Sequence, residues 1–237
     1  MMGMNTILSG FSGVLLPYSV RTDDFFMVVL AVMCLLYAFL YSKCRKYLAG
    51  QYRNFFRDRS RNSSFTDAAL VDVRYLAVLF VLACMSVGMT AYNLLMRTVP
   101  GSVELSSPAL LFGASTVAIL LYFGAKLLSY SIIGNVFFGR SAVSVWNDAY
   151  LLVIYTAGVV LYPFLILMVF MEIGIRFSII LLAILLIFAK IMIFCKWIKV
   201  FFQNHDSLFL LILYFCALEI VPFFLLYKGI GKFLVVF

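Results

Sequence analysis

Six long apolar runs divide most of this sequence and constrain its fold more than any other feature. A helix of about 20 apolar residues is enough to cross the hydrocarbon core of a bilayer, and each run is near or above that length. Membrane-spanning β-strands are shorter and alternate in polarity, which these runs do not. The sequence therefore predicts an all-α, polytopic membrane helix bundle with spans at about 24–42, 75–96, 109–138, 149–171, 177–194 and 207–227.

The composition agrees with a lipid environment. Hydrophobic residues make up 65% of the chain and charged residues 12%, whereas a soluble domain is nearer half apolar and a quarter charged. The net charge of +8 would suggest nucleic acid in a soluble protein, but here most basic residues lie in one loop beside a span. We therefore expect contacts with anionic lipid headgroups and with protein partners in the membrane, and none with nucleic acid.

The distribution of basic residues predicts the orientation of the spans. Eleven lysine and arginine residues flank the spans on one side and five on the other. The positive-inside rule places the eleven in the cytoplasm and both termini in the periplasm. We expect three regions, namely an extracytoplasmic or interfacial segment at 1–23, a six-span domain at 24–228 and a short extracytoplasmic tail at 229–237. Residues 1–20 lack the features of a signal peptide; a re-entrant piece or an extra span is the alternative for them.

The cytoplasmic loop at 43–74 begins with an amphipathic pattern. In "KCRKYLAGQYRNFFRDRSR", Leu48, Tyr52 and Phe55 recur at helical spacing, and the basic residues fall mostly on the other faces. This pattern predicts a basic helix lying in the membrane interface. One interpretation is a docking site for a partner or anionic lipid, and the favoured one is a helix that only anchors topology. The basic residues in question are Arg45, Lys46, Arg53, Arg57 and Arg59.

Small residues four apart predict close helix packing. Such pairs include Cys84 with Gly88 and Ala109 with Gly113, and we expect them to pack within this chain rather than in a dimer. Signature motifs of soluble enzymes are absent, and the sequence has a single histidine, His205. The sequence thus offers no catalytic, cofactor-binding or metal-binding residues, and it leans away from an enzyme.

Three ionisable residues lie inside the predicted spans: Lys126, Lys190 and Glu219. Both lysines fall toward the cytoplasmic ends of their spans, so we expect them to snorkel to the headgroups. Glu219 lies about 18 Å along its helix from Ser207 at 1.5 Å per residue, and its side chain is too short to snorkel far. It is therefore expected either to be protonated by burial or to pair with a lysine from a neighbouring helix.

Two prolines lie beside polar side chains at a similar height. Pro222 follows Glu219, Pro163 follows Tyr162, and each proline frees one backbone carbonyl in its helix. We expect Tyr162 and Glu219 to face each other or to share a water, so Glu219→Gln should be mild and Glu219→Leu severe. This layer is either a proton relay or substrate contact, or a hydrogen-bonded lock on helix register; the lock is favoured.

The last span resembles a known family. "LFLLILYFCALEIVPFFLLYK" is similar to the closing motif of a multi-pass inner-membrane family from bacteroidete bacteria, domain of unknown function 4271. The matching residues are Leu213, Tyr214, Cys216, Leu218, Glu219, Ile220, Pro222, Leu226, Tyr227 and Lys228. The resemblance covers about 24–228 and implies a bacterial inner membrane, but no activity or cofactor. We expect a non-enzymatic structural or accessory subunit of a larger cell-envelope assembly. The alternative is a small proton-coupled transporter or channel that uses Glu219, and a lipid-modifying enzyme ranks third.

Overall fold

The computed structural model describes residues 23–56, 73–98, 107–137, 140–171 and 174–201. Within these ranges lie five helices long and apolar enough to cross a membrane, which confirms the predicted helical membrane fold. The sixth predicted span, the segment at 1–22 and most of the loop after residue 56 lie outside the described residues. The helices are α1 (Asp24–Phe56), α3 (Val73–Thr98), α4 (Pro108–Phe137), α5 (Arg140–Phe170) and α6 (Ile175–Phe201).

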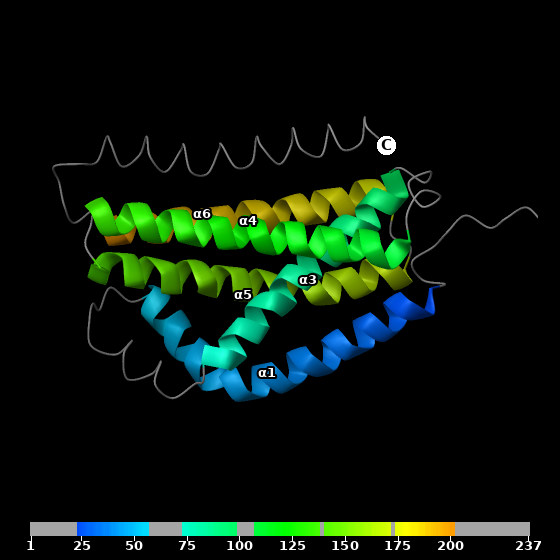
Figure 1. The fold of residues 1–237 in the computed structure, drawn as a ribbon, viewed down its shortest axis with the longest axis horizontal. Coiled ribbons are helices and arrows are strands. Elements are labelled where there is room, and N and C mark those ends of the chain that lie inside the picture. The colour runs from blue at the N-terminus through cyan, green and yellow to red at the C-terminus, as the bar shows by residue number, and fades with distance from the viewer. Residues whose placement is uncertain (1–22, 57–72, 99–106, 138–139, 172–173, 202–237) are drawn as a thin grey trace, which may run out of the picture.

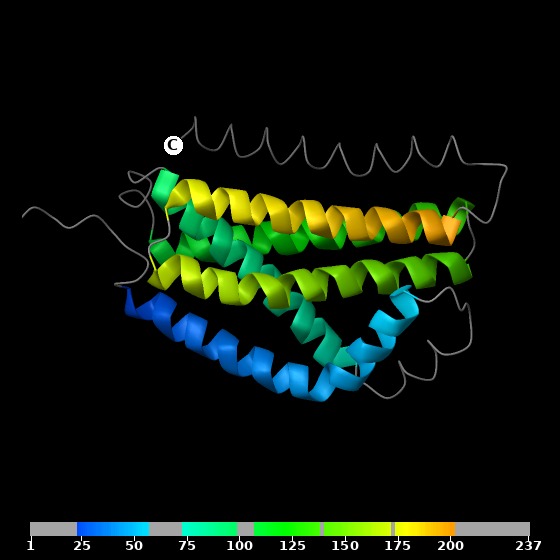
Figure 2. The same cartoon turned by 180° about the vertical axis from the view of Figure 1, so that it is seen from behind.

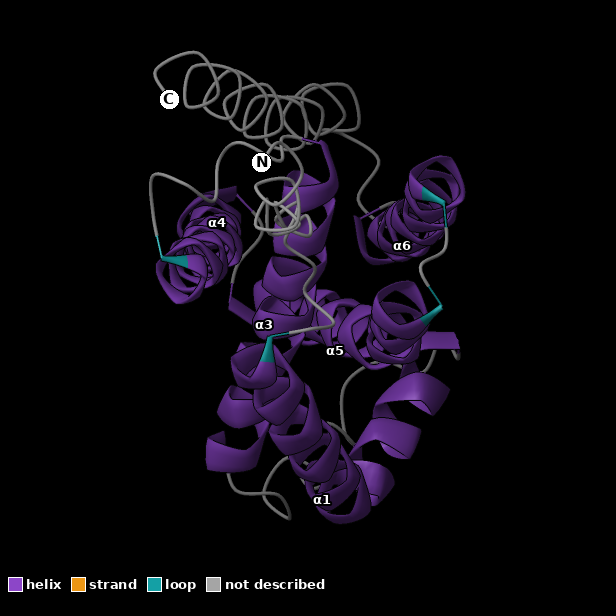
Figure 3. Ribbon diagram, turned by 90° about the vertical axis from the view of Figure 1, so that its right-hand side faces the viewer, coloured by secondary structure: helices purple, strands orange, loops and turns teal. Residues whose placement is uncertain are grey.

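Helix α5 is the centre of this arrangement, because it contacts α1, α3, α4 and α6. Helix α3 crosses the others diagonally, starting near α1 and ending close to the start of α4 (Figure 1). Seen from behind, α4, α5 and α6 all run along the long axis (Figure 2), and α5 contacts both α4 and α6. The end-on view places α1 on the opposite side of α5 from α4 and α6 (Figure 3).

Burial differs strongly among the helices, and α1 is intermediate with 28% of its apolar stretch buried. About half of the apolar stretch is buried in α3 (50%) and α5 (56%), but only 6% in α4 and 11% in α6. Within the described residues the core is therefore built around α3 and α5, and α4 and α6 present wide apolar faces outward. Outward apolar faces are what a lipid solvent allows, because no hydrophobic penalty attaches to them there.

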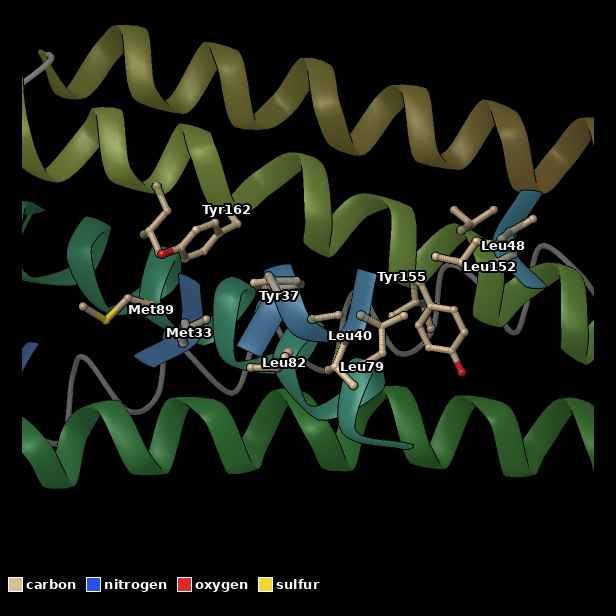
Figure 4. Close-up of a cluster of buried hydrophobic side chains, with 14 of the residues drawn as sticks. Met33, Tyr37, Leu40, Leu48, Leu79, Leu82, Met89, Leu152, Tyr155 and Tyr162 are labelled. Atoms are coloured by element: carbon tan, nitrogen blue, oxygen red, sulfur yellow. The ribbon is translucent and has the colours of Figure 1, made fainter. Parts of the chain in front are cut away.

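The core is filled by large side chains, several of them aromatic (Figure 4). Phe26 of α1 stacks on Tyr92 of α3 with ring centroids 4.7 Å apart, and its edge meets Phe112 of α4 at 5.8 Å. Such offset and edge-to-face contacts add to the packing energy of aromatic side chains. These rings join α1, α3 and α4 at one end of the bundle.

Small residues allow α3 to approach its neighbours closely. A Cβ atom on Gly88 would lie 2.6 Å from Thr116 Oγ1 of α4, so the predicted packing of the Cys84 and Gly88 face within this chain is confirmed. The predicted close packing of the Ala109 and Gly113 face of α4 is not found. Ala109 is exposed and Gly113 has no neighbour within 4 Å among the described residues, so no close packing is found for this pair.

The amphipathic segment after the first span is present, but it continues α1 rather than forming a separate helix. The 33-residue helix extends 14 residues past the predicted span end at Ser42 (42 to 56), and its last part turns toward α5 (Figure 2). Tyr47, Leu48 and Phe55 are buried there. The apolar side of this segment therefore packs on the protein itself.

Candidate functional site

The predicted polar layer begins at Tyr162, where it ties three helices together. The Tyr162 hydroxyl donates to the backbone carbonyl of Leu30 in α1 at 2.8 Å. Its ring packs on that of Tyr37 at 5.1 Å between centroids, and both side chains are labelled in Figure 4. The Tyr37 hydroxyl bonds to Ser86 Oγ of α3 at 2.8 Å. The layer thus links α5 to α1 and α1 to α3.

The direction of these hydrogen bonds can be deduced. Ser86 Oγ donates to the Leu82 carbonyl one turn earlier in α3 at 3.0 Å. A hydroxyl has one proton to donate, so Tyr37 must be the donor to Ser86. Each hydroxyl proton in this layer therefore points toward a backbone carbonyl, either directly or through one further hydroxyl. The groups involved are buried, and hydrogen bonds in such a low-dielectric interior hold helices strongly.

The partner predicted for Tyr162 is outside the part of the chain that the structure describes. Glu219 and Pro222 are outside the described residues, so their contact with Tyr162 stays a prediction. Because Tyr162 already donates its proton to Leu30, a contact with Glu219 would require Tyr162 to accept, and Glu219 would have to be the protonated donor. Pro163 lies inside α5 as expected, where it cannot donate to the Val159 carbonyl.

Lys126 occupies a different environment from the one predicted. Its side chain is only 5% exposed, and its Nζ lies over the rings of Tyr122, Tyr130 and Tyr150 at 5.8, 5.9 and 5.8 Å from the centroids. The prediction that Lys126 reaches the headgroups was therefore wrong. Desolvated cation–π contacts stabilise the ammonium where it is.

Lys190 of α6 completes this cluster. It interacts with Lys126, although its side chain as a whole is exposed. Sequence reasoning missed the tyrosines. Tyr122 and Tyr130 lie four residues before and after Lys126, a spacing that puts all three on one helix face and that was available from the sequence. Tyr150 comes from α5 and required the fold.

The basic end of α1 is fixed to α5 and α6. The hydroxyls of Tyr52 and Thr156 share a hydrogen bond. Lys196 of α6 donates to the Phe55 carbonyl at 3.2 Å, and its Nζ lies 5.2 Å from the centroid of the Phe55 ring. The predicted lipid- or partner-facing residues Arg45, Lys46 and Arg53 are exposed, whereas Arg57 and Arg59 lie outside the described residues.

A second basic contact, not anticipated from the sequence, fixes the other end of the bundle. Arg97 at the end of α3 donates to the Met168 carbonyl of α5 at 2.6 Å and to Asn93 Oδ1 at 3.1 Å. Carbonyls in the last turn of a helix have no intrahelical partner, so a guanidinium from another helix suits them. In the described ranges there is no group of three or more His, Cys, Asp or Glu residues that could hold a metal ion.

Comparison with protein families finds a match to "Domain of unknown function (DUF4271)" over residues 26–230. No curated protein and no solved structure matches the chain.

Proposed function

This chain belongs to the family of the domain of unknown function DUF4271, and we propose that it is a non-enzymatic structural or accessory subunit of a larger assembly in the bacterial cell envelope. The family match and the apolar helices fit a membrane protein. The buried polar layer supports a structural role within the membrane.

The observation that carries the proposal is how the hydroxyls of that layer are used. Tyr162 donates to the Leu30 carbonyl, and Tyr37 donates through Ser86 to Leu82. A transport pathway through a membrane is typically lined by ionisable groups that take up and release a charge. Hydroxyls held on backbone carbonyls instead fix the relative positions of α1, α3 and α5. This supports a scaffold more than a conducting path.

The exposed basic residues support a location on the cytoplasmic face of the inner membrane. Arg45, Lys46 and Arg53 project from the last part of α1. Each basic residue near an anionic membrane surface contributes about 1 kcal/mol of attraction. Together with the eleven-to-five distribution of basic residues, this favours both termini in the periplasm and anionic lipid at the end of α1.

Photo-crosslinking in native membranes tests the accessory role. A photoreactive residue would replace Leu121 of α4 or Ile187 of α6, which are 63% and 59% exposed. We expect one reproducible adduct with a resident membrane protein, identified by mass spectrometry. Leu79 of α3 is only 1% exposed and is the matched control, because it should give crosslinks only within the chain. Lipid adducts alone at both exposed positions would contradict the proposal.

A flux measurement distinguishes this role from the transporter. Purified protein in proteoliposomes with an imposed pH gradient should dissipate the gradient no faster than protein-free vesicles. A proton flux that is present in the wild type and lost in Glu219→Gln would instead establish the proton-coupled transporter or channel.

A further inference from the structure

Helix α6 presents an apolar face with one lysine at its centre. Leu186 and Phe194 lie four residues before and after Lys190, a spacing that places all three on one side of the helix. Leu186 and Phe194 are 53% and 49% exposed, and Lys190 is exposed as well. Charged residues inside membrane spans are costly beside lipid and commonly pair with one another. This face therefore suits an apolar helix that carries one carboxylate.

The chain continues from α6 into a segment of that composition. Helix α6 ends at Phe201, and the sixth predicted span, 207–227, follows after residues 202–206; it lies outside the described residues. The connection from 201 to 207 reaches at most about 20 Å, and packed helices lie about 8–10 Å apart. Helices joined by so short a connection are usually antiparallel neighbours, so this segment can reach the face of α6.

The acid of that segment and the lysine of α6 lie at the same level in such a pair. Lys190 is 11 residues before Phe201, and Glu219 is 12 residues after Ser207. At 1.5 Å per residue, both lie about 16–18 Å from the connection.

The described helices α4 and α5 show that this way of counting holds in the bundle. Lys126 is 11 residues before Phe137, the end of α4, and Tyr150 is 10 residues after Arg140, the start of α5. The Nζ atom of Lys126 lies 5.8 Å from the centroid of the Tyr150 ring. Residues at equal distances from a short connection therefore meet across two neighbouring helices.

The apolar neighbours of the two charges also match. Phe215 and Phe223 lie four residues before and after Glu219. In an antiparallel pair with α6 they are level with Phe194 and Leu186, one helical turn to either side of the charges. The two surfaces are thus complementary both in charge and in apolar contacts.

Tyr162 is a less suitable partner for the acid than the lysine of α6. The Tyr162 hydroxyl donates to the Leu30 carbonyl of α1, and α1 lies on the opposite side of α5 from α6 (Figure 3). A segment held beside α6 by residues 202–206 is therefore placed closer to Lys190.

We propose that the segment 207–227 packs on the face of α6 formed by Leu186, Lys190 and Phe194, and that Glu219 forms an ion pair with Lys190. The occupant is this chain rather than a second protein, because the short connection keeps the segment beside α6. The ion pair fixes the height of the last span against α6.

Charge exchange in the full chain tests the ion pair. Lys190→Glu brings two carboxylates together and Glu219→Lys brings two ammonium groups together. Each change should therefore lower the thermal unfolding midpoint in detergent by about 5 °C or more. Lys190→Glu combined with Glu219→Lys should recover most of this loss, because the pair is restored with its charges exchanged.

Arg176→Glu is the matched control. Arg176 is an exposed basic residue of the same helix, 14 residues before Lys190 and so about 21 Å away along the axis. Arg176→Glu combined with Glu219→Lys should show no recovery of the midpoint. An equal recovery in both combinations would overturn the ion pair.

Crosslinking tests the packing independently of the charges. Cysteines replace Phe194 and Phe215 in a variant whose five native cysteines are alanine, and a short bismaleimide is added in native membranes. We expect a crosslink within one chain. Phe188→Cys with Phe215→Cys is the control and should not crosslink, because Phe188 is 62% exposed on another side of α6 and about 9 Å further from the connection than Phe194.

The outcomes separate the two parts of the proposal. No crosslink in the first cysteine pair, or a crosslink only between two chains, would overturn the packing. A crosslink within the chain without recovery in the charge exchange would overturn the ion pair. Leu121 of α4 is not part of this face, so photo-crosslinking there to a partner protein reports on a different surface.

Discussion

At the scale of single residues, Gly158 is the described glycine that has the least room for a side chain. A Cβ atom there would lie 2.5 Å from Ala83 Cβ and 2.7 Å from Ala83 Cα in α3. Since a backbone must shift to make room, we expect Gly158→Ala to destabilise the protein by about 1–3 kcal/mol. Thermal unfolding in detergent measures this. Gly113→Ala is the matched control, because nothing lies within 4 Å of Gly113 among the described residues; its midpoint should be unchanged or slightly higher. Equal midpoints for the two variants would contradict the close contact.

The hydroxyl of Tyr162 gives a second residue-scale prediction. Tyr162→Phe removes the hydrogen bond to the Leu30 carbonyl, which should cost about 0.5–1.5 kcal/mol. If Glu219 also contacts Tyr162, a double-mutant cycle with Glu219→Gln should show a coupling of about 0.5 kcal/mol or more. The control cycle uses Tyr52→Phe, which removes the hydrogen bond to Thr156 and should be additive with Glu219→Gln. If the effects were additive in both cycles, Glu219 would not interact with Tyr162.

At the scale of elements, the end of α1 depends on contacts with α5 and α6 rather than on the bilayer alone. Phe55 is 7% exposed and lies against Lys196. Phe55→Ala should weaken this attachment, since truncating a buried phenylalanine costs about 3–5 kcal/mol. We therefore expect trypsin to cleave at Arg53 severalfold faster in inside-out membrane vesicles. Phe39→Ala is the control, because Phe39 pairs with Lys43 in the same helix but is 52% exposed. Equal cleavage rates in both variants would contradict a packed end.

At the scale of the whole molecule, the sequence predicts the elements better than their contacts. The lengths of the apolar runs were enough to locate the five described spans. A helix must be about 20 apolar residues long to cross a bilayer, and such a run can be recognised in the sequence without knowing the fold. Apolar length did not predict where the helices extend beyond the predicted spans; α5 starts at Arg140, nine residues before the predicted Ala149. No breaker separates these segments from the spans. The cluster around Lys126 needed the fold, because the ring of Tyr150 and the amino group of Lys190 come from other helices.

The orientation of the whole bundle remains a prediction with a direct measurement. Helices α4 and α6 end where α5 begins, and the basic end of α1 lies toward the same side (Figure 1). Single cysteines at the exposed positions Arg53 and Ser107, in a variant whose five native cysteines are replaced by alanine, report the two sides. We expect an impermeant maleimide to label Ser107→Cys in spheroplasts and Arg53→Cys only after permeabilisation, because the eleven basic residues favour the cytoplasm. The reverse pattern would invert the assignment of both termini.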